Sequence, residues 1–226
     1  ICLGWHSIGG VGGNDTLYSM VSGTKGMNVI APTWFSMTDE YGAFRSFATA
    51  DYVTTAHNMG LQGWGVLDNF NYANENGISI STLNMLSSTT ARQTLVQNVT
   101  DTAVSLGLDG INVDFEQLSS DCGPHYVEFL RELSIQCRNK GLVLSVDNYV
   151  PFNFNDYYRL DIQGQVADYV IIMGYDEHWH GSKDPGSVAS IGYVSDGLDR
   201  TLQEVPANKV VNALPFYTIL WKTEGT

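Results

Sequence analysis

Short apolar stretches rich in β-branched and aromatic residues recur along the chain and predict β-strands. Segments with helical periodicity separate several of them, so strands and helices alternate along most of the sequence. The seven predicted strands are ICLGWHSI, NVIAPTWF, LQGWGVL, GINVDFEQL, LVLSVDNYV, DYVIIMGYD and KVVNALPFY.

Apolar residues spaced three and four positions apart predict helices between these strands. One such stripe runs through residues 96–106 and stops at Gly107, and a glycine directly after a helix is a common end signal. A second stripe begins near Pro124 and stops at Gly141. The helices are therefore expected at 49–59, 88–106, 124–140 and 190–203.

The alternation predicts right-handed βαβ crossovers and a parallel sheet covered on both faces. The segment GGVGGND at residues 9–15 is expected to be a loop, because no helix pattern of the dinucleotide-binding kind follows it. A closed (β/α)8 TIM barrel is therefore favoured over an open doubly wound sheet. Residues 1–226 are interpreted as one domain.

The strand count affects how that barrel closes. A (β/α)8 barrel needs eight strands, and the sequence predicts seven, with only KTEGT remaining after NALPFYTILW. We expect the eighth strand to be absent from this sequence, either because the protein continues past Thr226 or because a neighbouring chain or an open cleft takes its place. Open barrel edges favour self-association.

The fourth predicted strand carries acidic side chains in an otherwise apolar run, DGINVDFEQL. Alternate residues of a strand point to the same face, so Asn112, Asp114 and Glu116 share one side and the apolar residues between them share the other. Unpartnered buried carboxylates cost free energy. This polar face is therefore either a solvated edge or a functional site.

Composition narrows the partner class. The chain has 226 residues, of which 43% are hydrophobic and 15% charged, enough for one packed core. Its formal net charge of -13 argues against nucleic acid and is compatible with a neutral sugar polymer. No apolar run approaches the roughly 18 to 20 residues of a membrane span. Cys2, Cys122 and Cys137 lack metal-site spacing and are expected to be free thiols.

The motif DGINVDFE resembles the D-G-x-D-x-D-x-E signature of glycoside hydrolase family 18, the chitinase-like enzymes. The segment MGYD at 173–176 is similar to the M-x-Y-D segment on that family's sixth strand. Within the family, PTWF, DNYVP, GYDEHW, GSVASI and LPFYTILW are most similar to the bacterial branch that trims spore-cortex peptidoglycan. The resemblance covers essentially the whole chain and implies a catalytic barrel.

This resemblance implies a retaining reaction in which the 2-acetamido group of the substrate attacks the anomeric carbon. Glu116 is implied as the general acid, with its proton retained through partial burial and a neighbouring Asp114 anion. Asp114 would hold the acetamide N–H, and Tyr175 its carbonyl oxygen. The candidate substrate contacts are Asp176, Tyr217, Asn148, Asn69, Trp34 and Trp179, whereas Asp109 and Gly110 complete the structural motif.

Two positions depart from the family pattern. Asn112 stands where the signature has its middle aspartate; its amide can hydrogen-bond Asp114 but cannot take its proton. We expect retained activity with a simpler acid limb in the pH profile. Ile219 stands where related sequences often have arginine, so one substrate contact is expected to be absent.

Other functions remain open from the residues alone. Asp114 and Glu116 could hold a hard cation, and the HWH at 178–180 invites a zinc site, but neither has the further ligands at a recognisable spacing. We expect no metal and no cofactor. A non-catalytic carbohydrate-binding module is the main alternative, and the presence of Glu116 favours the enzyme. Tryptophans such as Trp34 and Trp179 more often belong to a core or rim than to a sugar platform.

The expected substrate is a polysaccharide or oligosaccharide that contains N-acetylglucosamine, cleaved at β-1,4 linkages. The resemblance implies spore-cortex or cell-wall peptidoglycan first and chitin second. It also implies that the protein acts outside a bacterial cell, in the cell envelope or in the spore coat.

Overall fold

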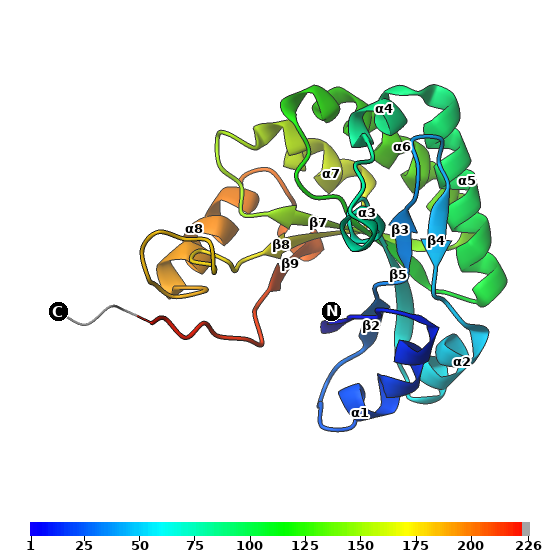
Figure 1. Cartoon of the computed structure of the whole chain (residues 1–226), viewed down its shortest axis with the longest axis horizontal. Coiled ribbons are helices and arrows are strands. Elements are labelled where there is room, and N and C mark those ends of the chain that lie inside the picture. The colour runs from blue at the N-terminus through cyan, green and yellow to red at the C-terminus, as the bar shows by residue number, and fades with distance from the viewer. Residues whose placement is uncertain (223–226) are drawn as a thin grey trace.

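A curved sheet forms the centre of the molecule in the computed structural model, which describes residues 1–222 (Figure 1). Neighbouring strands along its main path all run parallel. In order across the sheet they are β1 (Leu3–His6), β2 (Val29–Pro32), β5 (Gln62–Asp68), β6 (Gly110–Asp114), β7 (Val143–Tyr149), β8 (Tyr169–Met173) and β9 (Val210–Ala213). These are the seven strands that the sequence predicts.

The four predicted helices are also present. They are α2 (Ala50–Asn58), α5 (Thr89–Leu106), α6 (Gly123–Lys140) and α8 (Ile191–Thr201). The Ser88 hydroxyl accepts a hydrogen bond from the Ala91 N–H at the start of α5, and Gly107 ends this helix with a φ of 76°. Gly141 ends α6 in the same way, with a φ of 70°. Glycine adopts this left-handed conformation at little cost, which explains both end signals.

Several short elements have no clear sequence signal. β3 (Phe35–Met37) pairs in parallel with the end of β5 and antiparallel with β4 (Phe44–Ser46). The predicted strand 28–35 is therefore split, since β2 ends at Pro32, which has no N–H to donate to a ladder. The other unpredicted elements are α1 (Leu17–Val21), α3 (Asn71–Asn76), α4 (Thr82–Ser87) and α7 (Leu160–Val166).

The expectation of a plain loop at residues 9–15 is wrong. A 3-10 helix occupies Val11–Thr16 and continues into α1. Further single 3-10 turns lie at Ser120–Cys122, Asp156–Tyr158 and Ala207–Lys209. Such short helices contain too few turns to show an apolar stripe, so periodicity cannot reveal them.

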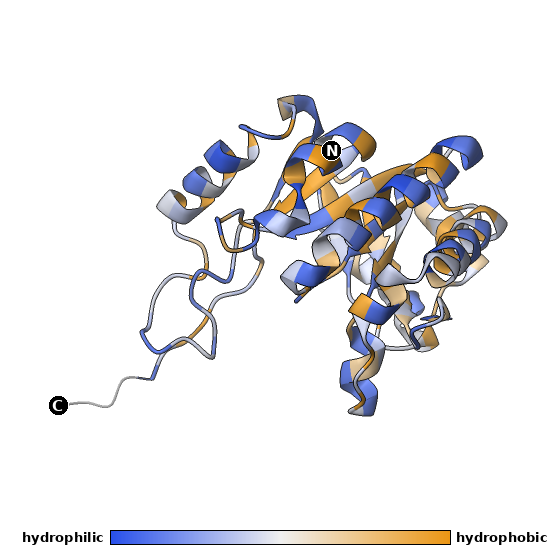
Figure 2. Cartoon of the chain, turned by 90° about the horizontal axis from the view of Figure 1, so that it is seen from above, coloured by the Kyte–Doolittle hydropathy of each residue, from blue (hydrophilic) through white to orange (hydrophobic). Residues whose placement is uncertain are grey.

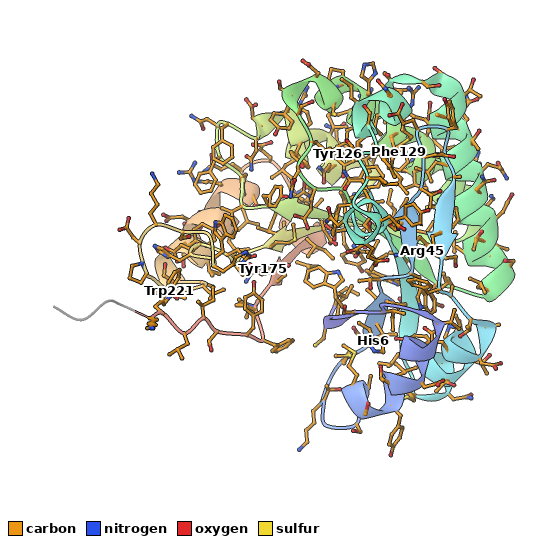
Figure 3. The ribbon with its side chains drawn as sticks, in the orientation of Figure 1. His6, Arg45, Tyr126, Phe129, Tyr175 and Trp221 are labelled. Atoms are coloured by element: carbon orange, nitrogen blue, oxygen red, sulfur yellow. The ribbon has the colours of Figure 1, made fainter. Side chains whose placement is uncertain are left out.

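The apolar face of β6 packs into the core. Ile111, Val113 and Phe115 are buried, and the Phe115 ring stacks on Phe129 of α6 with 5.3 Å between centroids and 8° between planes. Tyr126 lies beside Phe129 in the same layer (Figure 3). Hydrophobic residues are concentrated on the strands, whereas the long helices alternate between hydrophobic and hydrophilic positions (Figure 2). The opposite, polar face of β6 therefore points to the concave side of the sheet.

Strands β1 and β9 are the two ends of the parallel path. Seven strands and no eighth lie on this path in the part of the chain that the structure describes. A cavity of about 560 Å³ lies between the two end strands and is lined by apolar residues such as Trp5, Ile171 and Val211. Self-association through these edges stays a prediction. Within residues 1–222, no helix combines the length and the apolar character that crossing a bilayer requires.

Candidate active site

Polar side chains gather where three neighbouring parallel strands end. β6 contributes Asn112 and Asp114, β7 contributes Asp147 and Tyr149, and the strand register places Asp68 of β5 opposite Asp114. In barrel enzymes the carboxyl ends of the strands carry the chemistry. The polar face that the sequence predicts on β6 is thus part of a larger acidic cluster.

Glu116 lies two residues beyond the end of β6, and the chain turns at Gln117, whose φ is 53°. The side chain of Asn69 holds this turn. Its Oδ1 accepts a hydrogen bond from the Glu116 N–H at 2.9 Å, and its Nδ2 donates to the Glu116 carbonyl at 3.0 Å. Its second donor bond goes to Thr82. These bonds make Asn69 a support for Glu116, and its role as a substrate contact stays a prediction.

The carboxyl of Glu116 has an unusual environment. The Tyr149 hydroxyl donates to its Oε2 at 2.6 Å. Burial raises the pKa of Glu116, the bond from Tyr149 opposes that rise, and the charges of Asp176 and Asp68 add to it. The direction agrees with the sequence expectation, but Asp176 and Asp68 supply the main charge effects instead of Asp114. A raised pKa keeps the group protonated to higher pH, as a proton donor requires.

Asp114 carries the strongest sign of a functional carboxyl. Its Oδ1 is buried and has no hydrogen-bond partner within residues 1–222. Burial raises its pKa well above the usual range, and the charges of Asp147, Glu116 and Asp68 raise it further. A buried polar atom without a partner is costly, so such an atom commonly marks a site that a ligand completes.

Asn112 is completely buried and all its hydrogen-bonding groups are engaged elsewhere. Its Nδ2 donates to Ser145 Oγ and to Asp147 Oδ1, both at 2.9 Å, and its Oδ1 accepts from Trp5 Nε1 at 3.0 Å. The hydrogen bond to Asp114 that the sequence suggested is not formed, because both amide hydrogens point to β7.

A cavity of about 350 Å³ opens beside Glu116. Its polar lining comes from the ends of three strands and the segment after β8. The residues are Glu116, Tyr149, Val150, Met173, Tyr175, Asp176, Trp179 and Tyr193. The larger cavity between β1 and β9 has no acidic residue in its lining, so the acidic residues lie at the smaller one.

Residues after β8 line the same cavity as Glu116. Tyr175 lies just beyond the strand (Figure 3), and burial raises the pKa of its phenol. The Tyr217 hydroxyl donates to Asp176, and the rings of Tyr175 and Tyr217 meet edge to face with centroids 6.2 Å apart. The structure therefore brings Tyr175, Asp176 and Tyr217 together. Trp179 lines the same cavity and is 48% exposed, so a ring face is available.

Asp109 and Gly110 lie at the other end of β6, away from the cavity. The Asp109 carboxylate accepts from the Gly63 N–H at 2.7 Å and contacts His57 at 2.9 Å. A Cβ on Gly110 would lie 2.8 Å from the Trp64 ring and from a backbone oxygen of β7. Both residues therefore support the sheet, as the structural part of the predicted motif.

Two predicted substrate contacts are wrong. Trp34 is only 1% exposed, donates to Asn14 and packs against Tyr52, so no face of its ring is open to a sugar. Asn148 is 2% exposed and exchanges hydrogen bonds with Gln163 of α7. It points to the helix side of β7, one residue out of phase with the polar face.

The functional face of β7 was missed from the sequence. Ser145, Asp147 and Tyr149 alternate along this strand and share the face that meets Asn112 and Glu116. Their spacing of two within LVLSVDNYV was the available signal. Trp5 of β1, which donates to Asn112, had no comparable signal because its partner lies 107 residues away.

Comparison with known proteins gives one family. Residues 73–226 match the family model described as Glycosyl hydrolases family 18. YdhD of Bacillus subtilis (strain 168) is 33% identical over 144 residues, which cover 61% of this chain and 33% of YdhD. A cortical fragment-lytic enzyme of Bacillus anthracis is 29% identical over 148 residues, with the same two coverages. The chain therefore spans about a third of the length of these relatives.

Solved structures show the same architecture. A chitinase from Chromobacterium violaceum ATCC 12472 superposes with a TM-score of 0.78 at 26% identity, over 95% of this chain and 68% of that one. The fold therefore agrees with the predicted (β/α)8 type.

Proposed function

The chain belongs to glycosyl hydrolases family 18, and on this basis we propose that it hydrolyses the glycosidic bond next to an N-acetylglucosamine residue. One observation carries the proposal. Glu116, whose pKa is raised, lines a cavity. Asp114 lies on the same strand face, and its buried Oδ1 has no hydrogen-bond partner within residues 1–222. A proton donor and an acceptor for an N–H group thus lie near each other.

In the proposed first step the proton of Glu116 moves to the leaving glycosidic oxygen as the bond from that oxygen to C1 breaks. The oxygen of the substrate's own 2-acetamido group forms a bond to C1 and gives an oxazolinium ion. Tyr149 already donates to Oε2 of Glu116, so the acidic proton resides on Oε1. Proton transfer from a positioned acid typically contributes about 10²- to 10⁴-fold to the rate.

Two other side chains orient the acetamide. The free Oδ1 of Asp114 accepts its N–H, and the carboxylate offsets the positive charge of the oxazolinium ion. Tyr175 donates to the acetamide oxygen from the end of β8. Holding the nucleophile against C1 in this way can lower a barrier by about 7 to 11 kcal/mol.

In the second step Glu116, now a carboxylate, takes a proton from water while the water oxygen bonds to C1. The bond between C1 and the acetamide oxygen breaks, and the acetamide is restored. Two displacements at C1 retain the β configuration. Asp176, Tyr217 and Trp179 contact the sugar that occupies this subsite.

For the substrate we propose peptidoglycan glycan, with the spore cortex first and chitin second. The similarity to a cortical fragment-lytic enzyme supports the first and the similarity to a chitinase supports the second. Both are glycans outside the cytoplasm, which supports action at the cell envelope or spore.

The test compares Glu116→Gln with the wild-type protein on both glycans. The variant should release no new reducing ends and should still bind N-acetylglucosamine oligosaccharides. Glu128→Gln on the exposed side of α6 is the matched control and should keep full turnover. Equal turnover by Glu116→Gln would defeat the acid assignment. Binding without turnover by the wild type would favour the non-catalytic alternative.

A further inference from the structure

Two carboxyl groups of the site lie on adjacent strands, pointing to the same face. Asp147 of β7 is 2% exposed, and its Oδ1 accepts from the Asn112 amide at 2.9 Å. Val113 pairs with Val146 in the register of β6 and β7, so one step further along, Asp114 comes next to Asp147. Neighbouring strands lie about 4.8 Å apart. Neither carboxyl belongs to an ion pair within residues 1–222.

Two carboxylates at adjacent positions of neighbouring strands disfavour each other's ionisation in a poorly hydrated interior, so one proton between them is the favoured state. Burial raises the pKa of Asp147 to about 8; bonds from Asn112 and Trp5 oppose the rise, and the charge of Glu116 adds to it. Asp147 in turn raises the pKa of Asp114. The other titratable groups around the pair are Asp68, Glu116 and the phenols of Tyr126 and Tyr175.

The proposed reaction needs Asp114 in its charged form. Its carboxylate must accept an N–H and face a cation, yet in the empty site its environment favours the neutral acid. The proton must therefore move to a nearby group when substrate binds. Asn112, at the position of the signature's middle aspartate, cannot accept it because an amide is not a base at these pH values.

We propose that Asp147 is a positioning residue that takes this proton from Asp114. The partner that holds the proton then lies on β7, and Asn112 links β6 to β7. The O–H bond of Asp114 breaks, an O–H bond forms on Oδ2 of Asp147, and the pair keeps one negative charge throughout. The Asn112 amide occupies Oδ1, which leaves Oδ2 for the proton. This inference rests on the proposed glycosidase function.

A titration of the substrate-free protein tests the coupling without any turnover. Aspartate side chains are labelled with ¹³C at the carboxyl carbon, and their titration is followed by NMR between pH 3 and 10. A change in apparent pKa of about one unit is the smallest that we treat as significant. In Asp147→Asn the apparent pKa of Asp114 should fall by more than that, because the adjacent charge is gone. An unchanged titration of Asp114 would overturn the proposal even if the protein proves to be an active glycosidase.

Kinetics then test the role in the reaction. Asp147→Asn should lower kcat about 10- to 100-fold and shift the acid limb of the kcat profile, while KM changes little. The exchanged variant Asn112→Asp/Asp147→Asn returns a carboxyl to the pair and should recover most of the rate. Ser145→Ala removes the second bond donated by the Asn112 amide without a change of charge and should keep the wild-type acid limb.

Two outcomes separate structural loss from loss of the proton holder. If Asp147→Asn fails to fold, the exchanged variant still carries the test, since it keeps one carboxyl and one amide. A folded exchanged variant that stays as slow as Asp147→Asn would contradict the proposal. The wild-type protein could turn over no glycan while the titration shows that Asp114 and Asp147 are coupled. The proposed function would then be wrong, and the inference that the two residues share a proton would remain.

Discussion

The hydroxyl of Tyr149 donates a hydrogen bond of 2.6 Å to Oε2 of Glu116 and thereby joins the end of β7 to the turn after β6. A hydrogen bond to the charged form of a carboxyl stabilises that form, so this contact lowers the pKa of Glu116 against the rise from burial. Tyr149 therefore orients the proposed acid and lowers the pH up to which that acid stays protonated.

Tyr149→Phe should shift the alkaline limb of kcat/KM to higher pH by about 0.5 to 1 unit. Glu116 must be protonated to act, activity disappears as pH rises through its pKa, and loss of the hydroxyl raises that pKa. The rate at the optimum should fall about tenfold because the carboxyl loses its anchor. Tyr157→Phe, which removes a hydroxyl bonded to the Leu118 carbonyl, should leave the limb in place. A shift to lower pH in Tyr149→Phe would contradict the assignment.

Asn69→Ala should slow the reaction by displacing Glu116 and not by removing a substrate contact. The change removes both bonds to the backbone of Glu116, so the carboxyl moves relative to the sugar and kcat/KM should fall about 10- to 100-fold. The free energy of unfolding should fall by about 1 to 3 kcal/mol. Steady-state kinetics and urea denaturation measure the two effects. Asn76→Ala, on the exposed side of α3, should change neither, and an equally active Asn69→Ala would refute the support role.

Trp179→Ala should weaken substrate binding more than it slows chemistry. If the ring contributes as much to the sugar as it does in an aromatic pair, about 0.5 to 1.5 kcal/mol, KM should rise about 2- to 10-fold with kcat nearly constant. Tyr41→Ala removes another exposed ring far from the cavity lining and should leave KM unchanged. A large fall in kcat with constant KM would place Trp179 in the reaction itself.

Asp147→Asn should make the protein more stable at high pH. A carboxyl whose pKa is about 8 in the folded state, against about 3.9 when unfolded, binds more protons when folded. The folded state therefore loses stability as pH rises from about 4 to 8.

The Asp147→Asn variant avoids this loss. Its gain in free energy of unfolding over the wild type should be absent near pH 4 and reach about 1 to 3 kcal/mol at pH 8. Denaturation at both pH values measures it, and Asp196→Asn on the surface of α8 should show no such gain. A gain that is greatest at pH 4 would contradict the raised pKa.

The main elements could be predicted because each one repeats its own signal. Buried parallel strands are continuous apolar runs, and α5 and α6 have long stripes with a glycine at the end. β3 and β4 have three residues each, which is too short for any period to be recognised. Their place depends on pairing with the end of β5, which is a contact between distant parts of the chain.

The site could be predicted only where one motif contains it. Glu116, Tyr175 and Asp176 stand in recognisable segments and line one cavity, and Asp114 shares the motif and the strand face of Glu116. Asn148 was named as a substrate contact and Asp147 was not considered, because either residue fits an apolar strand and only the pairing with β6 decides which face is polar. Trp34 was also predicted wrongly, since a tryptophan in a sequence gives no sign of how deeply its ring is buried.

Asn69 grips the peptide groups on either side of the Glu116 side chain and leaves the carboxyl itself to Tyr149. The hydrogen bonds that hold this turn therefore do not depend on the side-chain end group of residue 116. If Glu116 is the acid that we propose, a single codon change at that position would remove hydrolysis and leave the rest of the cavity lining in place.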